Sequence, residues 1–230
     1  GLDEQIATPH MVGAVALRRD GSLVAALADG FYRVDFAAAR IEAIWQTDQE
    51  SGNRFNDGKC DPDGRFWAGT MSLDGLRPSG SLYRLAGDRT VKRLLSGVSI
   101  SNGLAWSPDK KTVYYIDSPC REIWAFDYNQ TDAVPANKRT VVRTAADEGV
   151  PDGMTIDAGG CLWVAHWGGS RICVYDPRNG KKLDEIIFPV EQVSSCTFGG
   201  KNLNDLYVTT AWNTLSDTAR ALQPQAGALY

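Results

Sequence analysis

Three oxygen-bearing residues recur at one position of a repeated pattern. Asn56, Asn102 and Asp152 each lie ten or eleven residues before a β-prone run, and each begins a short phrase that contains glycine. Repeats that stack around an axis bring equivalent positions onto one ring. Amide and carboxylate oxygens are the ligands that hard divalent cations prefer. The spacing therefore predicts a cation site at the central mouth of a repeat protein.

The same phrases have a simpler interpretation. Asn-Gly and Asp-Gly pairs are common in tight turns, so each phrase taken alone would indicate a turn. We favour the cation site because the polar residue, the glycine and the following strand recur together. Asp57 and Lys59, which follow Asn56, are interpreted as turn and surface residues.

Two further residues could bind a ligand beside the cation. Arg54 precedes Asn56 by two residues, and in an extended strand this spacing places both side chains on one face. A guanidinium there binds an anionic or polyhydroxylated ligand, and a solvated rim charge is the alternative. Asp74 lies in a loop between two β-prone runs. It would either bind substrate hydroxyls or make an Asx turn, and the spacing alone favours the turn.

Short strands separated by turns must position these residues. The first β-prone run of each repeat begins 43 to 49 residues after the previous one, at Leu23, Phe66, Val113, Leu162 and Leu206. This period, with about four short strands per unit, is typical of β-propeller blades. An irregular β-sandwich is the alternative. We predict an all-β chain that forms one β-propeller domain of four-stranded blades over residues 1–230, with about five repeats visible.

Composition excludes several classes of function. The 230 residues carry 24 Lys and Arg against 28 Asp and Glu. The charges are interspersed and form no basic stripe, which argues against nucleic acid as the main partner. No apolar run is long enough to span a membrane. The chain has five widely spaced cysteines and two distant histidines. This pattern fits reduced core thiols better than a disulfide framework or a zinc site. We expect a cytoplasmic protein, monomeric or weakly homo-oligomeric, with a small-molecule partner.

Several segments resemble the senescence marker protein/gluconolactonase family, the regucalcin-like lactonases. They are Asn53–Lys59, Phe66–Met71, Ile100–Ser107, Pro151–Met154, Ser194–Asn202 and Gln223–Gly227. The similarity runs over nearly the whole chain. It implies a six-bladed propeller with one divalent cation in its central channel, and an enzyme that hydrolyses sugar-acid lactones.

The resemblance also implies roles for individual residues. Asn102 and Asp152 would be metal ligands, and Arg54 and Asn56 would contact the substrate. Asp74 lies where many members carry a glutamate that binds substrate hydroxyls. The expected reaction opens a gluconolactone, xylonolactone or arabinolactone to the aldonic acid, with a metal-polarised carbonyl and Asp152 as general base. Calcium, zinc, manganese and ferrous iron are all candidate cations, because oxygen ligands select only loosely among them.

The sequence departs from the family near its ends. The family takes a further metal ligand from a glutamate in an N-terminal Glu-x-Pro-x-Trp motif, which this sequence does not contain, and Glu4 has a different context. We expect the chain to lack most of a leading blade and a final strand. Two functions are alternatives to lactone hydrolysis. One is a metal-dependent esterase or organophosphate hydrolase on the same propeller, and the other is a non-catalytic calcium-binding propeller.

Overall fold

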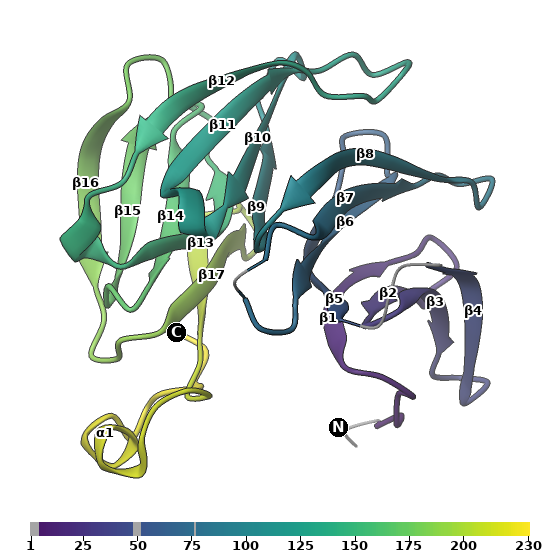
Figure 1. The fold of residues 1–230 in the computed structure, drawn as a ribbon, viewed down its shortest axis with the longest axis horizontal. Helices are drawn as coiled ribbons and strands as arrows, with labels where there is room; N and C mark the ends of the chain where they lie inside the picture. The colour runs from purple at the N-terminus through teal and green to yellow at the C-terminus, as the bar shows by residue number, and fades with distance from the viewer. Residues whose placement is uncertain (1–4, 48–51, 76) are drawn as a thin grey trace. The chain divides into compact units, whose positions relative to one another are not determined.

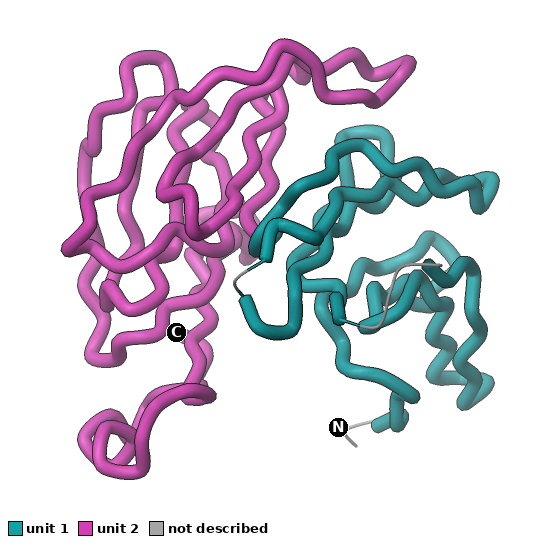
Figure 2. Tube along the Cα trace, viewed as in Figure 1, with its two compact units in different colours: residues 1–101 teal, residues 102–230 magenta. Residues whose placement is uncertain are grey.

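The computed structural model describes residues 5–47, 52–75 and 77–230 (Figure 1). Within these residues it contains four antiparallel sheets of four strands and one sheet of two strands. The chain divides into two compact units, residues 1–101 and 102–230 (Figure 2). In the described part of the chain, no helix combines the length and the apolar character that crossing a bilayer requires.

The first unit holds two four-stranded sheets, each a meander in which consecutive strands pair. The first sheet contains β1 (Val12–Leu17), β2 (Leu23–Leu27), β3 (Gly30–Asp35) and β4 (Arg40–Gln46). The second contains β5 (Asn53–Cys60), β6 (Phe66–Ser72), β7 (Gly80–Leu85) and β8 (Val91–Val98).

The second unit continues the same pattern. One sheet contains β9 (Ser101–Trp106), β10 (Thr112–Asp117), β11 (Glu122–Asp127) and β12 (Ala136–Arg143). The next contains β13 (Val150–Ile156), β14 (Leu162–Trp167), β15 (Arg171–Asp176) and β16 (Lys181–Ile187). Finally β17 (Val193–Gly199) pairs with β18 (Asp205–Thr210). Short helical turns are η1 (Ser118–Cys120), η2 (Ala146–Glu148) and α1 (Asp217–Leu222).

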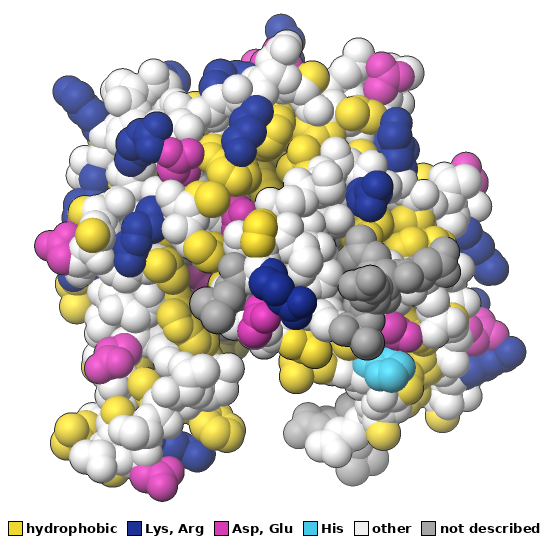
Figure 3. Space-filling model, in the orientation of Figure 1, with side chains coloured by type: hydrophobic (Ala, Val, Ile, Leu, Met, Phe, Trp, Pro, Cys, Tyr) yellow, Lys and Arg dark blue, Asp and Glu magenta, His cyan; other side chains and the backbone are white. Residues whose placement is uncertain are grey.

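The repeat predicted from the sequence corresponds to the sheets. Runs predicted to begin at Leu23, Phe66 and Leu162 are the starts of β2, β6 and β14, and the remaining two runs begin one residue inside β10 and β18. The prediction of an all-β chain built from four-stranded units is confirmed for the first four repeats. Basic and acidic side chains are interspersed on the face shown in Figure 3.

Apolar side chains hold neighbouring sheets together within each unit. In the first unit, the rings of Phe31 and Phe55 lie 5.0 Å apart between centroids, and Phe55 lies 5.7 Å from Tyr83. In the second unit, Ile116 and Ile123 of one sheet share a cluster with Val164 of the next. Packing of large apolar and aromatic groups is the main stabilising term of such sheets.

Two tryptophans form hydrogen bonds to the turn before them. Nε1 of Trp67 donates to Asp61 Oδ2 at 3.1 Å, and Nε1 of Trp163 donates to Asp157 Oδ2 at 2.9 Å. The other oxygen of Asp157 accepts the backbone N–H of Cys161 at 2.9 Å. Each aspartate therefore joins a turn to the second strand of its sheet.

Glycines let the first strands of adjacent sheets approach closely. A Cβ atom on Gly103 in β9 would lie 2.7 Å from the carbonyl oxygen of Asp152 in β13. One on Gly153 would lie 2.8 Å from the carbonyl oxygen of Ser194 in β17, and one on Gly13 in β1 would lie 2.6 Å from that of Asn56 in β5. Side chains do not fit at such distances, so these positions require glycine.

This packing overturns the interpretation of the glycine phrases as turns. The phrases at Asn102 and Asp152 lie inside β9 and β13. Asp57 and Lys59, predicted as turn and surface residues, lie inside β5 and are half-buried. The turn interpretation was wrong because the local preference of these pairs yields to the close approach of two strands.

Two of the polar residues, Asn56 and Asp152, lie at irregularities in strand pairing. The register between β5 and β6 shifts between Phe55 and Gly58, around Asn56. The register between β13 and β14 shifts between Pro151 and Met154, around Asp152. A β-bulge bends its strand and re-aims a side chain out of the regular alternation. A bulge therefore sets the direction of the Asn56 side chain in the first unit and of the Asp152 side chain in the second.

Replacing Gly153 with alanine tests the close approach. We expect Gly153→Ala to lower the free energy of unfolding by about 1–3 kcal/mol, because the methyl group would overlap the side chain of Ser195 and the carbonyl oxygen of Ser194 in β17. The measurement is urea unfolding followed by fluorescence. Gly87→Ala is the matched control, since a Cβ there meets no atom within 4 Å. Equal stability of the Gly153 variant and the wild type would contradict this account.

Candidate functional site

In the first unit, hydrogen bonds fix the side chain of Asn56. Its Oδ1 accepts from Arg54 Nη1 at 2.9 Å, and its Nδ2 donates to the carbonyl oxygen of Ser101 at 2.9 Å. Arg54 Nη1 also donates to the carbonyl of Phe55 at 3.0 Å. The two side chains therefore lie together, as expected for residues two apart in a strand. Their contact with a substrate stays a prediction.

Burial has an electrostatic consequence for Arg54. The half-buried position lowers the pKa of its guanidinium, because desolvation disfavours the charged form. Its hydrogen bonds described above go to neutral oxygens, which compensate the charge only partly. An electron-rich or anionic group brought beside Arg54 would therefore be attracted more strongly than at an exposed arginine.

In the second unit, a chain of hydrogen bonds orients Asn102. Its Nδ2 donates to Ser118 Oγ at 2.7 Å, and Ser118 Oγ donates to the carbonyl of Pro151 at 2.6 Å. Asn102 and Ser118 are both buried. The chain links β9 through the start of η1 to β13, next to Asp152. Since Ser118 engages the amide nitrogen, the side-chain atom that Asn102 can offer to a cation is Oδ1.

The structure brings the Asn102 and Asp152 segments side by side. Gly103 packs against the backbone oxygen of Asp152, and Ser118 bonds to the residue before it. Ser118 was not predicted from the sequence, where its only signal is its place directly after a β-prone run. The prediction that Asn102 and Asp152 are metal ligands stays a prediction.

Asp74 lies in the turn that follows β6. Its Oδ2 pairs with Arg77 Nε at 2.8 Å, and its Oδ1 accepts the backbone N–H of Arg77 at 3.4 Å. The backbone N–H of Gly75 donates to Ser72 at 3.0 Å. The predicted turn is thus present, and its aspartate is 41% exposed. Contact between Asp74 and a substrate stays a prediction.

Glu4, near the start of the chain, has a different context from the family's N-terminal glutamate. It lies outside the described residues, which begin at residue 5.

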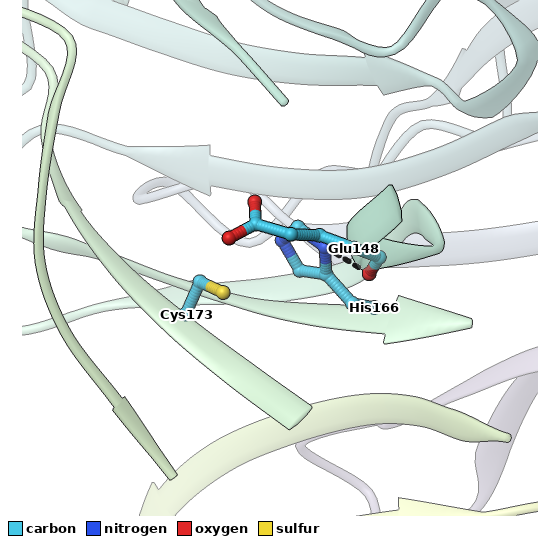
Figure 4. Close-up of side chains that lie close together, drawn as sticks. All are labelled: Glu148, His166 and Cys173. Atoms are coloured by element: carbon cyan, nitrogen blue, oxygen red, sulfur yellow. Dashed lines mark hydrogen bonds between the residues drawn. The ribbon is translucent and has the colours of Figure 1, made fainter. Parts of the chain in front are cut away.

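A second polar cluster in the second unit was not predicted (Figure 4). One possible ligand atom from each of Glu148, His166 and Cys173 lies within 4.8 Å of the other two. His166 and Cys173 are fully buried, and Glu148 is partly exposed. The three residues come from η2, β14 and β15 and have no regular spacing. Only the pairing of the strands brings them together.

Burial favours the neutral forms of the imidazole and the thiol. Desolvation lowers the pKa of His166 and raises the pKa of the Cys173 thiol. His166 Nδ1 lies 2.9 Å from the carbonyl oxygen of Glu148, and Nε2 lies 3.1 Å from the hydroxyl of Tyr175. A carbonyl only accepts, so Nδ1 carries the hydrogen and Nε2 accepts from Tyr175.

Comparisons of sequence place the chain among known proteins. A family model described as the SMP-30/gluconolactonase/LRE-like region matches residues 1–212. Regucalcin of Danio rerio is 43% identical over 230 residues, which cover 99% of this chain and 78% of that protein. The putative sugar lactone lactonase YvrE of Bacillus subtilis (strain 168) is 40% identical over 230 residues, 100% of this chain and 79% of the relative.

Comparison with solved structures gives the same result as the sequence comparisons. A crystal structure of a calcium-binding protein, regucalcin from Agrobacterium tumefaciens, superposes with a TM-score of 0.91 at 29% identity. The match covers 97% of this chain and 76% of that one. The resemblance found in the sequence segments is therefore confirmed, and the chain belongs to the SMP-30/gluconolactonase/LRE-like family.

Proposed function

We propose that the protein hydrolyses the lactone of a sugar acid to the open aldonic acid, with the help of one divalent cation. The observation that carries this proposal is the hydrogen-bond chain from Asn102 through Ser118 to Pro151. It ties Asn102 in β9 to the backbone directly before Asp152 in β13. Membership in a family that includes a putative sugar lactone lactonase supports the choice of substrate.

The residues present fit a hard cation. Asn102 would contribute Oδ1, since its nitrogen is engaged by Ser118, and Asp152 would contribute a carboxylate oxygen. Calcium, manganese, ferrous iron and zinc all accept oxygen ligands of this kind. When bound, the cation would polarise the lactone carbonyl and stabilise the oxyanion that forms on it.

Asp152 would handle the proton of the reaction. Its carboxylate takes a proton from water as the water oxygen bonds to the carbonyl carbon. The bond between that carbon and the ring oxygen then breaks, and Asp152 returns the proton to the departing oxygen. One water is consumed, and one carboxylic acid and one hydroxyl are formed.

Arg54 and Asn56 would orient the substrate. The two side chains are held in one arrangement by bonds to each other and to Ser101, so little motion must be lost on binding. Arg54 would donate to a lactone oxygen or hydroxyl. Asp74 would bind a more distant hydroxyl of the sugar.

The architecture and cellular setting form part of the proposal. We infer that the sheets are blades of a six-bladed propeller, as the family resemblance implies. A monomeric or weakly oligomeric cytoplasmic protein suits a small soluble substrate.

A second function is favoured by one specific observation. The relative from Agrobacterium tumefaciens is described as a calcium-binding protein. The same oxygen ligands would allow this chain to bind calcium without catalysis. Turnover measurements separate the two functions.

Substitution of Asp152 tests its role as base. We expect Asp152→Asn to lower lactone turnover by about 10²-fold or more, because an amide cannot take the proton. Pentono- and hexonolactones are assayed by acid release. Asp147→Asn, an exposed residue of the same unit, removes the same charge and should leave turnover unchanged. Full activity of the Asp152 variant would refute the assignment.

Removal of the cation separates catalysis from simple binding. We expect chelator treatment to abolish turnover and a single added divalent cation to restore it. A rise in melting temperature without turnover for any cation would instead support the calcium-binding function.

Ser118 provides an independent test of how the site is held. We expect Ser118→Ala to weaken cation affinity by roughly tenfold, since the Nδ2 of Asn102 and the carbonyl of Pro151 lose their shared partner. Calorimetric titration measures this affinity, and excess cation should restore turnover. Unchanged cation affinity in a folded variant would show that the hydrogen-bond chain does not hold the ligands.

A further inference from the structure

We propose that Glu148, His166 and Cys173 form a second cation site, which takes a zinc-class ion and is separate from the oxygen site of Asn102 and Asp152. One ligand atom from each residue lies within 4.8 Å of the others. Figure 4 shows the three side chains converging from η2, β14 and β15. A thiol, an imidazole and a carboxylate together are the ligand types of zinc sites.

The imidazole is already oriented as a ligand. Nδ1 of His166 donates to the carbonyl of Glu148 at 2.9 Å, so Nε2 carries the lone pair that could bind a cation. Metal-binding histidines usually donate their other ring N–H to a carbonyl or carboxylate in this manner, which fixes both tautomer and ring orientation. Here the backbone of one ligand, Glu148, orients the side chain of another.

Tyr175 occupies the position that a cation would share. Its hydroxyl donates to Nε2 of His166 at 3.1 Å, and it also interacts with the Cys173 thiol. The Tyr175 hydroxyl therefore interacts with both the imidazole and the thiol when no metal is bound. When a cation binds, Nε2 bonds to the cation in place of the hydroxyl, and the hydroxyl is left to donate to the thiolate sulfur.

The charge around Glu148 can rearrange to admit a cation. Lys182 Nζ contacts Glu148 Oε1 and lies 3.0 Å from Glu185 Oε2, and Arg171 lies 2.9 Å from the same Glu185 oxygen. Lys182 can therefore keep Glu185 as its partner when Glu148 turns to the cation. The S–H bond of Cys173 breaks, a sulfur–metal bond forms, and the proton passes to solvent.

The donor set predicts which cation binds. Calcium and magnesium prefer all-oxygen ligands, whereas thiolate and imidazole favour zinc and related transition ions. The second unit would thus hold two sites of different selectivity, with a hard cation at Asn102 and Asp152 and a softer one at the buried cluster. This inference does not depend on lactone hydrolysis, since each site is tested by binding alone.

Cobalt(II) is the probe, because a cobalt–thiolate bond gives a charge-transfer absorption that oxygen ligands do not give. We expect one equivalent of cobalt to produce this band in the wild-type chain and in Asp152→Asn. Cys173→Ser should abolish the band, and Glu148→Gln should weaken cobalt affinity by more than about tenfold. Cys120→Ser removes an exposed thiol and should leave the band intact.

The buried Cys173 variant could lose the band simply because it fails to fold. Glu148→Gln avoids this problem, since Glu148 is partly exposed. Glu148→Gln keeps the size of the side chain and its contact with His166 through the backbone, and circular dichroism verifies its fold. Absence of the band at saturating cobalt in the wild type would overturn the proposal. Survival of the band in Cys173→Ser, or its loss in Asp152→Asn or Cys120→Ser, would overturn it as well.

Discussion

The first strands of adjacent sheets approach so closely that a β-carbon does not fit between them. A β-carbon on Gly13, Gly103 or Gly153 would lie only 2.6–2.8 Å from a backbone oxygen of the next first strand. This constraint explains why glycine recurs in the repeat, since any larger residue would force the sheets apart. Irregular pairing lies at the same places, since the register of β1 shifts beside Gly13 and that of β13 shifts around Asp152 and Gly153.

The polar residues follow from the same constraint. At a bulge the side chain leaves the alternation of the strand, so Asn56 and Asp152 need not point into the apolar layers between sheets. Polar groups so placed must still be satisfied. Asn56 binds Arg54 and Ser101, while Asn102 binds Ser118. These hydrogen bonds hold each side chain in one orientation, which a binding site requires.

Sequence reasoning found the strands because their signals are local. Turn residues before Phe66 and Leu162 and β-prone residues after them suffice to place β6 and β14. It misplaced Asp57 and treated Asn-Gly as ambiguous, because the deciding contact comes from a strand far along the chain. Ser118 and the cluster around His166 were missed for the same reason, since no spacing in the sequence records which strands pair.

The two polar clusters of the second unit meet at one short segment. The backbone between Glu148 and Asp152 is held at its start by His166, which donates to the carbonyl of Glu148, and near its end by Ser118, which donates to that of Pro151. Arg121, which lies between η1 and β11, donates to the carbonyl of Gly149 between them. These donors thus fix the passage from η2 into the irregular start of β13. Because Asp152 ends this segment, the buried imidazole helps to set its position even though the two side chains belong to different clusters.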